Sequence, residues 1–308
     1  MQDRPTDVTF RNGSVDLAGH LRVPKGTDAA RPLPAIVLAT PGSSVKEQSG
    51  ANYARRLTES GFVTLTFDPS YQGQSGGAPR DLEIPAVRAE DIRCAVDFLT
   101  TQAIVDAGRI GLLGICAGGG YAVNAALTDH RVRALGTVVP VNIGRARRDA
   151  GPEALRAQLA AVGAQRSAEA RGAAPRRDPW IPDTIEAARA AGITDIDVLG
   201  AVEFYRTPRG FDAHATNRLM FTSLAPMIGF DAFHLVEELL VQPLQVVVGG
   251  RKGMTKSYED GEALFARAPN PQGFHVVEGA GHYDLYDKSP FIDEAVDALA
   301  GFFRAHLG

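Results

Sequence analysis

One cysteine stands where its surroundings could make it a nucleophile. Cys116 lies in the run GICAGGG (114–120), directly after an apolar stretch and directly before a helical pattern. A strand-turn-helix elbow exposes a side chain at a sharp turn, and its neighbours must be small because two chain segments pass closely there. The helix start adds positive potential and free N–H groups beside the sulfur, which lowers a thiol pKa. We therefore predict that Cys116 is a reactive nucleophile rather than a structural cysteine in a glycine-rich turn.

The base that would serve this thiol is His282. It follows the apolar run FHVVEG (274–279) and precedes the last helical pattern, and of the seven histidines it alone has that setting. A neutral imidazole near a thiol takes its proton and forms the reactive pair. The order along the chain, nucleophile before histidine, is also that of proteins with this elbow.

Acyl chemistry at this thiol also needs donors for a developing oxyanion. The backbone N–H of Ala117 directly follows the nucleophile, and a second donor is expected from the loop after the strand 34–41, at Gly42 or Ser43. An ordinary tight turn is the alternative at Gly42 and Ser43. Ser75, in the run GQSGG, matches the serine form of the elbow, but APRDLEIP follows and cannot open a helix at once. We interpret Ser75 as a loop residue.

Strands alternate with helices along most of the chain. This alternation predicts the α/β class, with a mostly parallel sheet of about eight strands and helices on both faces. The first segment instead predicts an antiparallel hairpin around Asn12-Gly13, and Ser289-Pro290 is typical of a helix start. The predicted strands are 34–41, 63–70, 109–116, 134–142, 244–250 and 274–279, and the predicted helices are 46–60, 85–101, 117–129, a segment near 258–268 and the C-terminal segment.

The alternation stops between 143 and 235, where short helices and loops are expected. We predict a core of 1–142 and 236–308 with an inserted helical lid of 143–235. Open α/β sheets bind ligands at the carboxyl ends of their strands, so the insertion is expected to cover that edge. A solvated excursion without a catalytic role is the alternative. The arginines at 145, 147 and 148 are surface residues or, alternatively, bind an anionic acyl carrier.

Composition excludes several classes of protein. A net charge of −4 leaves no electrostatic footprint for nucleic acid or an anionic membrane. No apolar run approaches membrane-spanning length and the first ten residues lack a signal-peptide pattern, so the cytoplasm is the expected location. Two cysteines are too few for a disulfide framework or a structural zinc site, and no metal or cofactor is expected. The expected partner is a small-molecule acyl substrate, free or carrier-bound; the oligomeric state stays open, with a dimer among the alternatives.

Five segments together carry a family resemblance: PGSSVKEQ (41–48), FDPSYQGQSGGAPR (67–80), GICAGGGYAVNAALTDHRVRAL (114–135), YRTPRG (205–210) and GHYDLYDK (281–288). The chain resembles the α/β-hydrolases related to dienelactone hydrolase and to the fungal polyketide transferases. The resemblance implies an α/β-hydrolase fold with a helical lid, and Cys116 and His282 as nucleophile and base. It further implies acyl chemistry on an ester, lactone or thioester, with Tyr71 and its neighbours lining the pocket.

The chain departs from that family in two places. Thr40, a candidate substrate contact, stands where the family usually has histidine. The third catalytic residue, an aspartate expected in a G-S-x-A-D pattern after the strand 244–250, is missing, and Gly253 lies near its position. A histidine that must hold one tautomer needs a partner on its second nitrogen.

Three side chains could replace the missing acid. Asn142 ends the strand 134–142 beside the expected position and would complete a Cys-His-Asn set; its alternative role is to close that strand as a turn residue. Asp284 and Glu47 are the other candidates, and a bare Cys-His dyad is the last alternative. On the Asn142 hypothesis, Asn142→Ala slows acylation and Gly253→Asp raises ester hydrolysis.

The leading functional hypothesis is an enzyme that forms a covalent acyl-enzyme on Cys116 and passes the acyl group to water or another acceptor. Cysteine suits thioesters and activated lactones because a thiolate is both a strong nucleophile and a good leaving group. A polyketide-type acyltransferase or cyclase, in which water is not the acceptor, is the second hypothesis. A protein that has lost catalysis and only binds a small molecule is the third; the missing acid favours it and the intact elbow opposes it.

Overall fold

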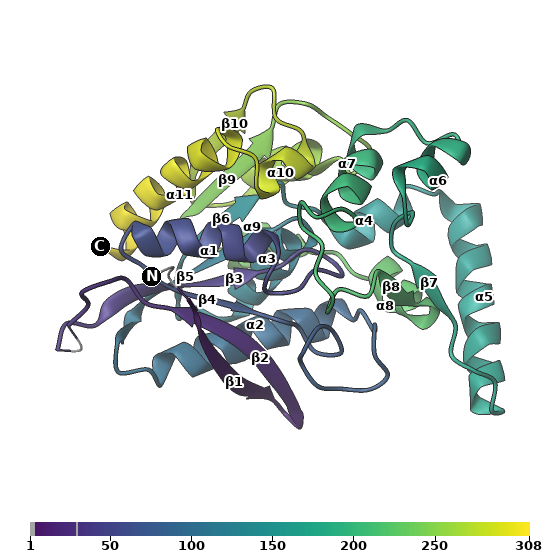
Figure 1. The fold of residues 1–308 in the computed structure, drawn as a ribbon, viewed down its shortest axis with the longest axis horizontal. Helices are drawn as coiled ribbons and strands as arrows, with labels where there is room; N and C mark the ends of the chain where they lie inside the picture. Colours follow the sequence, from purple (N-terminus) through teal and green to yellow (C-terminus); the bar gives the residue numbers. More distant parts are fainter. Residues whose placement is uncertain (1–3, 29) are drawn as a thin grey trace.

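A twisted sheet of eight strands organises the chain (Figure 1). The computed structural model describes residues 4–28 and 30–308. The first two strands form the predicted antiparallel hairpin, the second pairs antiparallel with β4, and every later pairing is parallel. In spatial order the strands are β1 (Thr6–Asn12), β2 (Val15–Arg22), β4 (Val63–Phe67), β3 (Leu33–Ala39), β5 (Val105–Ile115), β6 (Val132–Val138), β9 (Leu244–Gly249) and β10 (Pro271–Val277).

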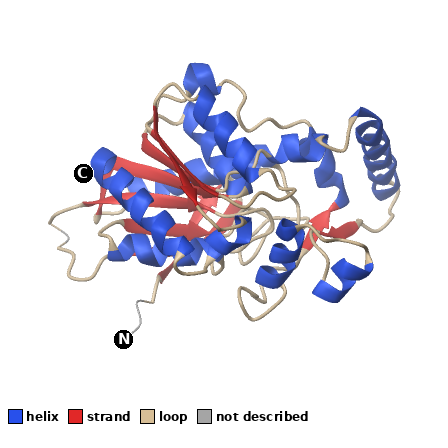
Figure 2. Ribbon diagram, turned by 90° about the horizontal axis from the view of Figure 1, so that it is seen from above, coloured by secondary structure: helices blue, strands red, loops and turns tan. Residues whose placement is uncertain are grey.

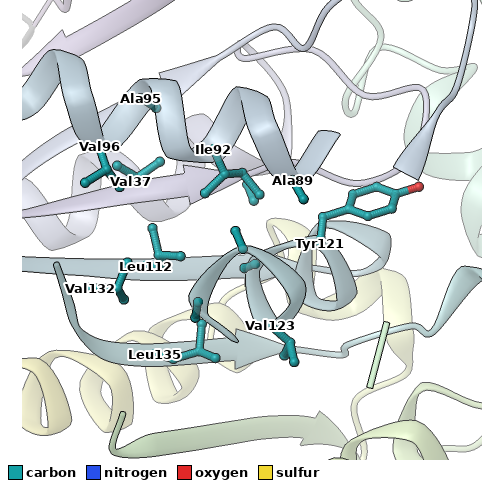
Figure 3. Packing of buried hydrophobic residues seen from close by; sticks show 14 of the residues in the cluster. Val37, Ala89, Ile92, Ala95, Val96, Leu112, Tyr121, Val123, Val132 and Leu135 are labelled. Atoms are coloured by element: carbon teal, nitrogen blue, oxygen red, sulfur yellow. The ribbon is translucent and has the colours of Figure 1, made fainter. Parts of the chain in front are cut away.

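Helices cover both faces of the sheet because its central strands alternate apolar residues between two cores. Leu112 of β5 packs into one core and Leu113 into the other. Figure 3 shows the first core, where Ala89, Ile92 and Val96 of one helix face the sheet. That face carries α2 (Pro85–Thr100), α3 (Ala117–Thr128), α9 (Val236–Leu239) and α10 (Ser257–Arg267), and the opposite face carries α1 (Ser49–Glu59) and α11 (Phe291–Leu307).

The segment 143–235 adds no strand to this sheet and lies to one side of it (Figures 1 and 2). The prediction of only short helices there was wrong, because α5 spans 19 residues, and a small antiparallel sheet of β7 and β8 was not foreseen. The elements are α4 (Ile143–Arg148), α5 (Pro152–Ala170), β7 (Arg177–Pro179), α6 (Ile185–Ala190), α7 (Ile196–Tyr205), β8 (Arg218–Met220), η1 (Phe221–Ser223) and α8 (Leu224–Ile228).

The predicted strands and helices of the core are present, with ends that shift by a few residues. One start differs in kind: α11 begins at Phe291 with Pro290 at its N-cap, so Ser289 is not the capping residue. Within the described residues, no helix combines the length and apolar character needed to cross a bilayer. The eight-stranded, mostly parallel sheet with helices on both faces agrees with the architecture expected from the sequence.

Candidate active site

Cys116 occupies the turn between β5 and α3. Its φ of 57° lies in the left-handed region, a strained conformation for a residue with a side chain. The turn closes tightly: a β-carbon on Gly114 would overlap the backbone of Gly118, and one on Gly118 would overlap the carbonyl oxygens of Ala39 and Thr40. The glycines therefore let the nucleophile loop pass between its neighbours, as the sequence pattern predicts.

Cys116 is half-buried, and its sulfur lies among hydrogen-bond donors. Burial raises the pKa of its thiol to about 11; the hydrogen bonds that the thiolate would accept from the Tyr286 hydroxyl and the N–H groups of Ala117 and Gly42 act in the opposite direction. The prediction of a lowered thiol pKa was wrong, because the cost of burying a charge exceeds the effect of the helix start. The same contacts place two backbone N–H groups beside the reacting atom.

His282 lies at the start of the 3₁₀ helix η2 (His282–Tyr286), which follows β10. Its Nδ1 lies 2.9 Å from Oγ of Ser257 and 3.4 Å from Oγ1 of Thr255. Burial lowers its pKa to about 3, so the ring is neutral at physiological pH. The Thr255 hydroxyl donates to Asp197, so its oxygen can accept from the ring, and we assign the proton to Nδ1 and the lone pair to Nε2.

Tyr286 stands between the thiol and the imidazole. Its hydroxyl lies 3.2 Å from Nε2 of His282 and is also hydrogen-bonded to the sulfur of Cys116. The segment GHYDLYDK carries the family resemblance, but the sequence alone does not assign Tyr286 a role. A tyrosine four residues after the histidine, on the same short helix, was the signal that could have found it.

The oxyanion loop, residues 40–48, is held by buried charges. The Arg88 guanidinium donates to the carbonyl oxygens of Thr40 and Pro41 at 2.7 and 3.3 Å. Asp68 accepts from the backbone N–H of Lys46 at 2.7 Å and from its ammonium at 3.0 Å. These contacts give the N–H of Gly42 a defined place, which suits preorganised stabilisation of an oxyanion.

Asn142 does not reach the histidine, which corrects the sequence prediction. Its side chain donates to Asp231 at 2.7 Å and accepts from the backbone N–H groups of Arg145 and Ala232. It caps the N-terminus of α4, which is the capping position that asparagine favours. The turn role that the sequence left as the alternative is the one the structure supports.

The other two candidates for the third residue are also engaged elsewhere. Asp284 accepts from the backbone N–H of Gly281 at 2.8 Å and pairs with Lys288. Glu47 pairs with the ammonium of Lys46 at 2.7 Å. Neither carboxylate has a hydrogen bond to His282 in the described structure.

A cavity of about 190 Å³ opens above Cys116, between the sheet edge and the insertion. Gly42, Ser43 and Ala117 line it, as expected, but Thr40 and Tyr71 do not, so their predicted roles as substrate contacts were wrong. Thr40 is buried beneath the loop, and the ring of Tyr71 packs against Gly77. Most of the remaining lining is apolar or aromatic: Pro41, Val141, Ile143, Ala146, Trp180, Ile181, Tyr205, Arg206, Ala215, Asn217, Thr255, Tyr283 and Tyr286.

Two of the arginines 145, 147 and 148 are engaged within the chain, and carrier binding by this group stays a prediction. Arg145 pairs with Asp260 and Asp149, and Arg148 donates to the carbonyl oxygens of residues 228 and 230. The Arg147 guanidinium lies over the ring of Trp180, with 5.6 Å to the centroid.

Ser75 has the loop role that the sequence predicts. Its hydroxyl donates to the carbonyl oxygen of Asp68 at 2.5 Å and accepts from the N–H of Ala18 at 2.9 Å. These bonds tie the loop to the hairpin and leave the hydroxyl no nucleophilic role.

One group of potential metal ligands lies outside the cavity. Ligand atoms of Glu47, Asp212 and His214 lie within 4.8 Å of one another. Glu47 is already paired with Lys46, and His214 is already paired with Asp212. The group is partly exposed and has no connection to Cys116.

Known proteins give this geometry a context. The family model for X-Pro dipeptidyl-peptidase (S15 family) matches residues 12–195. Protein YcjY of Escherichia coli (strain K12), described as uncharacterized, is 38% identical over 308 residues and covers 100% of both chains. The crystal structure of the hypothetical protein PA2218 from Pseudomonas aeruginosa has a TM-score of 0.90 at 32% identity, covering 99% of this chain and 95% of that one.

Two further likenesses bear on the family predicted from the sequence. Thiohydrolase aneE of Aspergillus aculeatus is 28% identical, with 89% of each chain covered. Dienelactone hydrolase from Anabaena variabilis shares the fold, with a TM-score of 0.56 at 15% identity over 99% of this chain and 100% of that one. The predicted resemblance to α/β-hydrolases of the dienelactone hydrolase kind is confirmed. The chain belongs to the X-Pro dipeptidyl-peptidase (S15) family, a family of hydrolases with the α/β-hydrolase fold.

Proposed function

We propose that the chain is a cysteine-dependent thioester hydrolase that acts on a small, uncharged, largely apolar acyl group. One observation carries the proposal: the sulfur of Cys116 lies in the elbow beside the N–H groups of Ala117 and Gly42 and opens onto the apolar cavity. The thiohydrolase name of the fungal relative supports the same reaction class.

A cysteine nucleophile itself favours thioesters over alkyl esters. Attack on a thioester expels a thiolate whose pKa is about 8.5 for a free thiol, which leaves at least as readily as the sulfur of Cys116. Attack on an alkyl ester must instead expel an alkoxide, which is a far poorer leaving group than the attacking thiolate. The tetrahedral intermediate of an alkyl ester would therefore mostly return to substrate.

Because the Cys116 thiol and the His282 imidazole are both uncharged at rest, the thiol proton must move during attack. The thiol proton passes to the Tyr286 oxygen while the tyrosine proton passes to Nε2 of His282, and the sulfur attacks the carbonyl carbon. The N–H groups of Ala117 and Gly42 donate to the oxyanion. The imidazolium returns a proton, through the same hydroxyl, to the departing thiolate, which leaves an acyl group on Cys116. Water then attacks that acyl group and gives its proton to His282, and the sulfur of Cys116 departs and is reprotonated.

The cavity indicates the class of acyl group. Its walls are mostly apolar, and the charged residue in its lining, Arg206, is already paired with Asp183 at 3.5 Å, so a carboxylate or an ammonium on the acyl chain would lose hydration for little gain. The indole Nε1 of Trp180, a cavity-lining residue, is buried without a hydrogen-bond partner in the described structure. It could satisfy one acceptor on the acyl chain, such as a keto or hydroxyl oxygen.

A chromogenic short-chain acyl thioester tests the proposal. A burst of thiol followed by steady turnover, with an acyl mass adduct on the peptide that contains Cys116, would support hydrolysis. A burst without turnover would replace hydrolysis by transfer to an acceptor other than water, and the absence of any burst would favour binding alone. An X-Pro p-nitroanilide assayed in parallel would overturn the proposal if it were the better substrate.

A further inference from the structure

A carboxylate from the insertion occupies the place of the missing acid. Gly253 lies in the loop after β9, where the sequence leads us to expect an aspartate. A β-carbon built on Gly253 would overlap the carboxyl group of Asp197, which belongs to the first turn of α7. The space that an acid of the loop would fill is therefore filled by a residue from another part of the chain.

Asp197 is connected to the histidine through one hydroxyl. Its Oδ2 accepts from the Thr255 hydroxyl at 2.5 Å and from the Thr255 N–H at 3.1 Å. Because that hydroxyl gives its proton to the carboxylate, its oxygen is free to accept from Nδ1–H of His282. Nδ1–H is then shared between the Thr255 oxygen, 3.4 Å away, and the nearer Ser257 oxygen, 2.9 Å away. The hydrogen bonds thus run from the imidazole through Thr255 to a buried negative charge.

The start of α7 is built to hold this carboxylate in place. Asp195 caps the helix by accepting from the N–H groups of residues 197 and 198, and its other oxygen accepts from the N–H of Met254. Asp197 is 2% exposed, and burial raises its pKa, while the two bonds from Thr255 act in the opposite direction. The positive end of the helix also favours the ionised form. α7 also packs against η2, the 3₁₀ helix that begins with His282.

We propose that Asp197 is the positioning carboxylate of the active site, acting on His282 through the Thr255 hydroxyl. It holds the ring in its Nδ1–H tautomer and stabilises the buried imidazolium that forms during acylation. Because α7 belongs to the insertion, the ring of His282 is held in this tautomer only when this part of the insertion lies against the core. This inference rests on the proposed roles of Cys116 and His282.

A purely structural role for Asp197 makes a different prediction, which Asp197→Asn separates. An asparagine can still accept from both groups of Thr255, so the tie between α7 and the loop survives while the charge is lost. We expect the single-turnover acylation rate to fall at least about tenfold with little change in KM. An acylation rate within about twofold of wild type would overturn the proposal.

Moving the carboxylate to the loop is the sharper test. Gly253→Asp alone should lower the acylation rate, because the new side chain competes with Asp197 for one space; the sequence alone predicts the opposite. In the double variant Asp197→Ala, Gly253→Asp that space is free. We expect it to acylate at least about fivefold faster than Asp197→Ala. A folded double variant that is no faster than Asp197→Ala would count against the proposal.

Two measurements keep this inference separate from the proposed function. Glu203→Gln is the matched control: it neutralises an exposed carboxylate of the same helix that pairs with Arg209 rather than with Thr255, and acylation should stay near the wild-type rate. The ¹⁵N chemical shifts of the His282 ring report its tautomer without any substrate. We expect one Nδ1–H form in the wild type and in Asp197→Asn, whose amide oxygen still accepts from Thr255, and a mixture of tautomers in Asp197→Ala, which has no acceptor. An unchanged tautomer in Asp197→Ala would overturn the inference even if no thioester proved to be a substrate, whereas a wild type that shows no burst would overturn only the proposed function.

Discussion

The β5–α3 elbow and the loop after β9 hold opposite sides of the same candidate site, and they are built differently. At the elbow, the nucleophile and the first oxyanion donor are neighbours in the sequence, and glycines within five residues permit the turn. At the loop after β9, the expected acid is replaced by a glycine, two hydroxyls and a carboxylate from α7. One side is specified locally, and the other is assembled from distant segments.

This difference teaches which parts of such a site can change independently. The elbow is constrained by its own backbone, because a β-carbon at Gly114 or Gly118 would collide with main chain. The acid is constrained only by where its carboxylate must lie, so any segment that reaches that place can supply it. The insertion of this chain reaches it and also lines the cavity.

Removing the nucleophile should give the largest effect. Cys116→Ala is expected to lower thioester turnover at least about a thousandfold, because no other nucleophile lies in the elbow. Its thermal midpoint should change little, since only one sulfur atom is lost. Cys94→Ala is the matched control, because Cys94 lies on α2 away from the cavity. Retention of half the wild-type rate by Cys116→Ala would place the nucleophile elsewhere.

Removing the hydroxyl between thiol and imidazole should give the next largest effect. Tyr286→Phe keeps the ring and its packing but interrupts the hydrogen bonds between Cys116 and His282. We expect the acylation rate to fall about tenfold to a hundredfold, within the range of general acid–base contributions. Tyr258→Phe, on α10, is the control and should acylate normally. An unchanged rate in Tyr286→Phe would mean that His282 takes the thiol proton directly.

The same contrast explains how much the sequence could predict. Cys116, Ala117 and His282 follow from local patterns, because a tight turn and the position after a strand leave signatures in adjacent residues. Asp197 leaves no such signature: its role depends on where α7 packs, 56 residues before Gly253 in the chain. The position of Asn142 at a strand end predicts a place near His282, but a tertiary hydrogen bond to Asp231 determines the direction of its side chain. Neighbourhood in a sheet can be predicted from sequence, whereas the orientation of a side chain at its edge cannot.

Opening the insertion side of the cavity should have a moderate effect on specificity. Trp180 lines the cavity, and a β-carbon at Gly42 would lie 3.1 Å from its Cη2 atom, so the indole covers the oxyanion loop. Trp180→Ala should raise KM about tenfold for a short acyl thioester and shift the preference toward longer chains, because a large side chain is lost. Phe211→Ala, at an exposed position of the same insertion, should leave the chain-length series unchanged. A Trp180→Ala series with the wild-type order would show that core residues alone determine acyl length.

The pH dependence should show the smallest change, and it tests whether the elbow pair rests as neutral groups. With a thiol pKa of about 11 and an imidazole pKa of about 3, neither group titrates between pH 5 and 9, so kcat/KM should vary less than about twofold there. An ion pair, as the sequence alone suggests, would instead give a limb within that range.

The lowered pKa of His282 also makes stability depend on pH. Below pH 6.5 the unfolded chain protonates His282, whereas the folded chain does not until about pH 3. The free energy of unfolding must then fall as pH is lowered through that window, by at most about 1.4 kcal/mol per pH unit from this residue. Urea unfolding of wild type and His282→Gln at several pH values measures that slope, and equal slopes for the two proteins would show that His282 is protonated in the folded state.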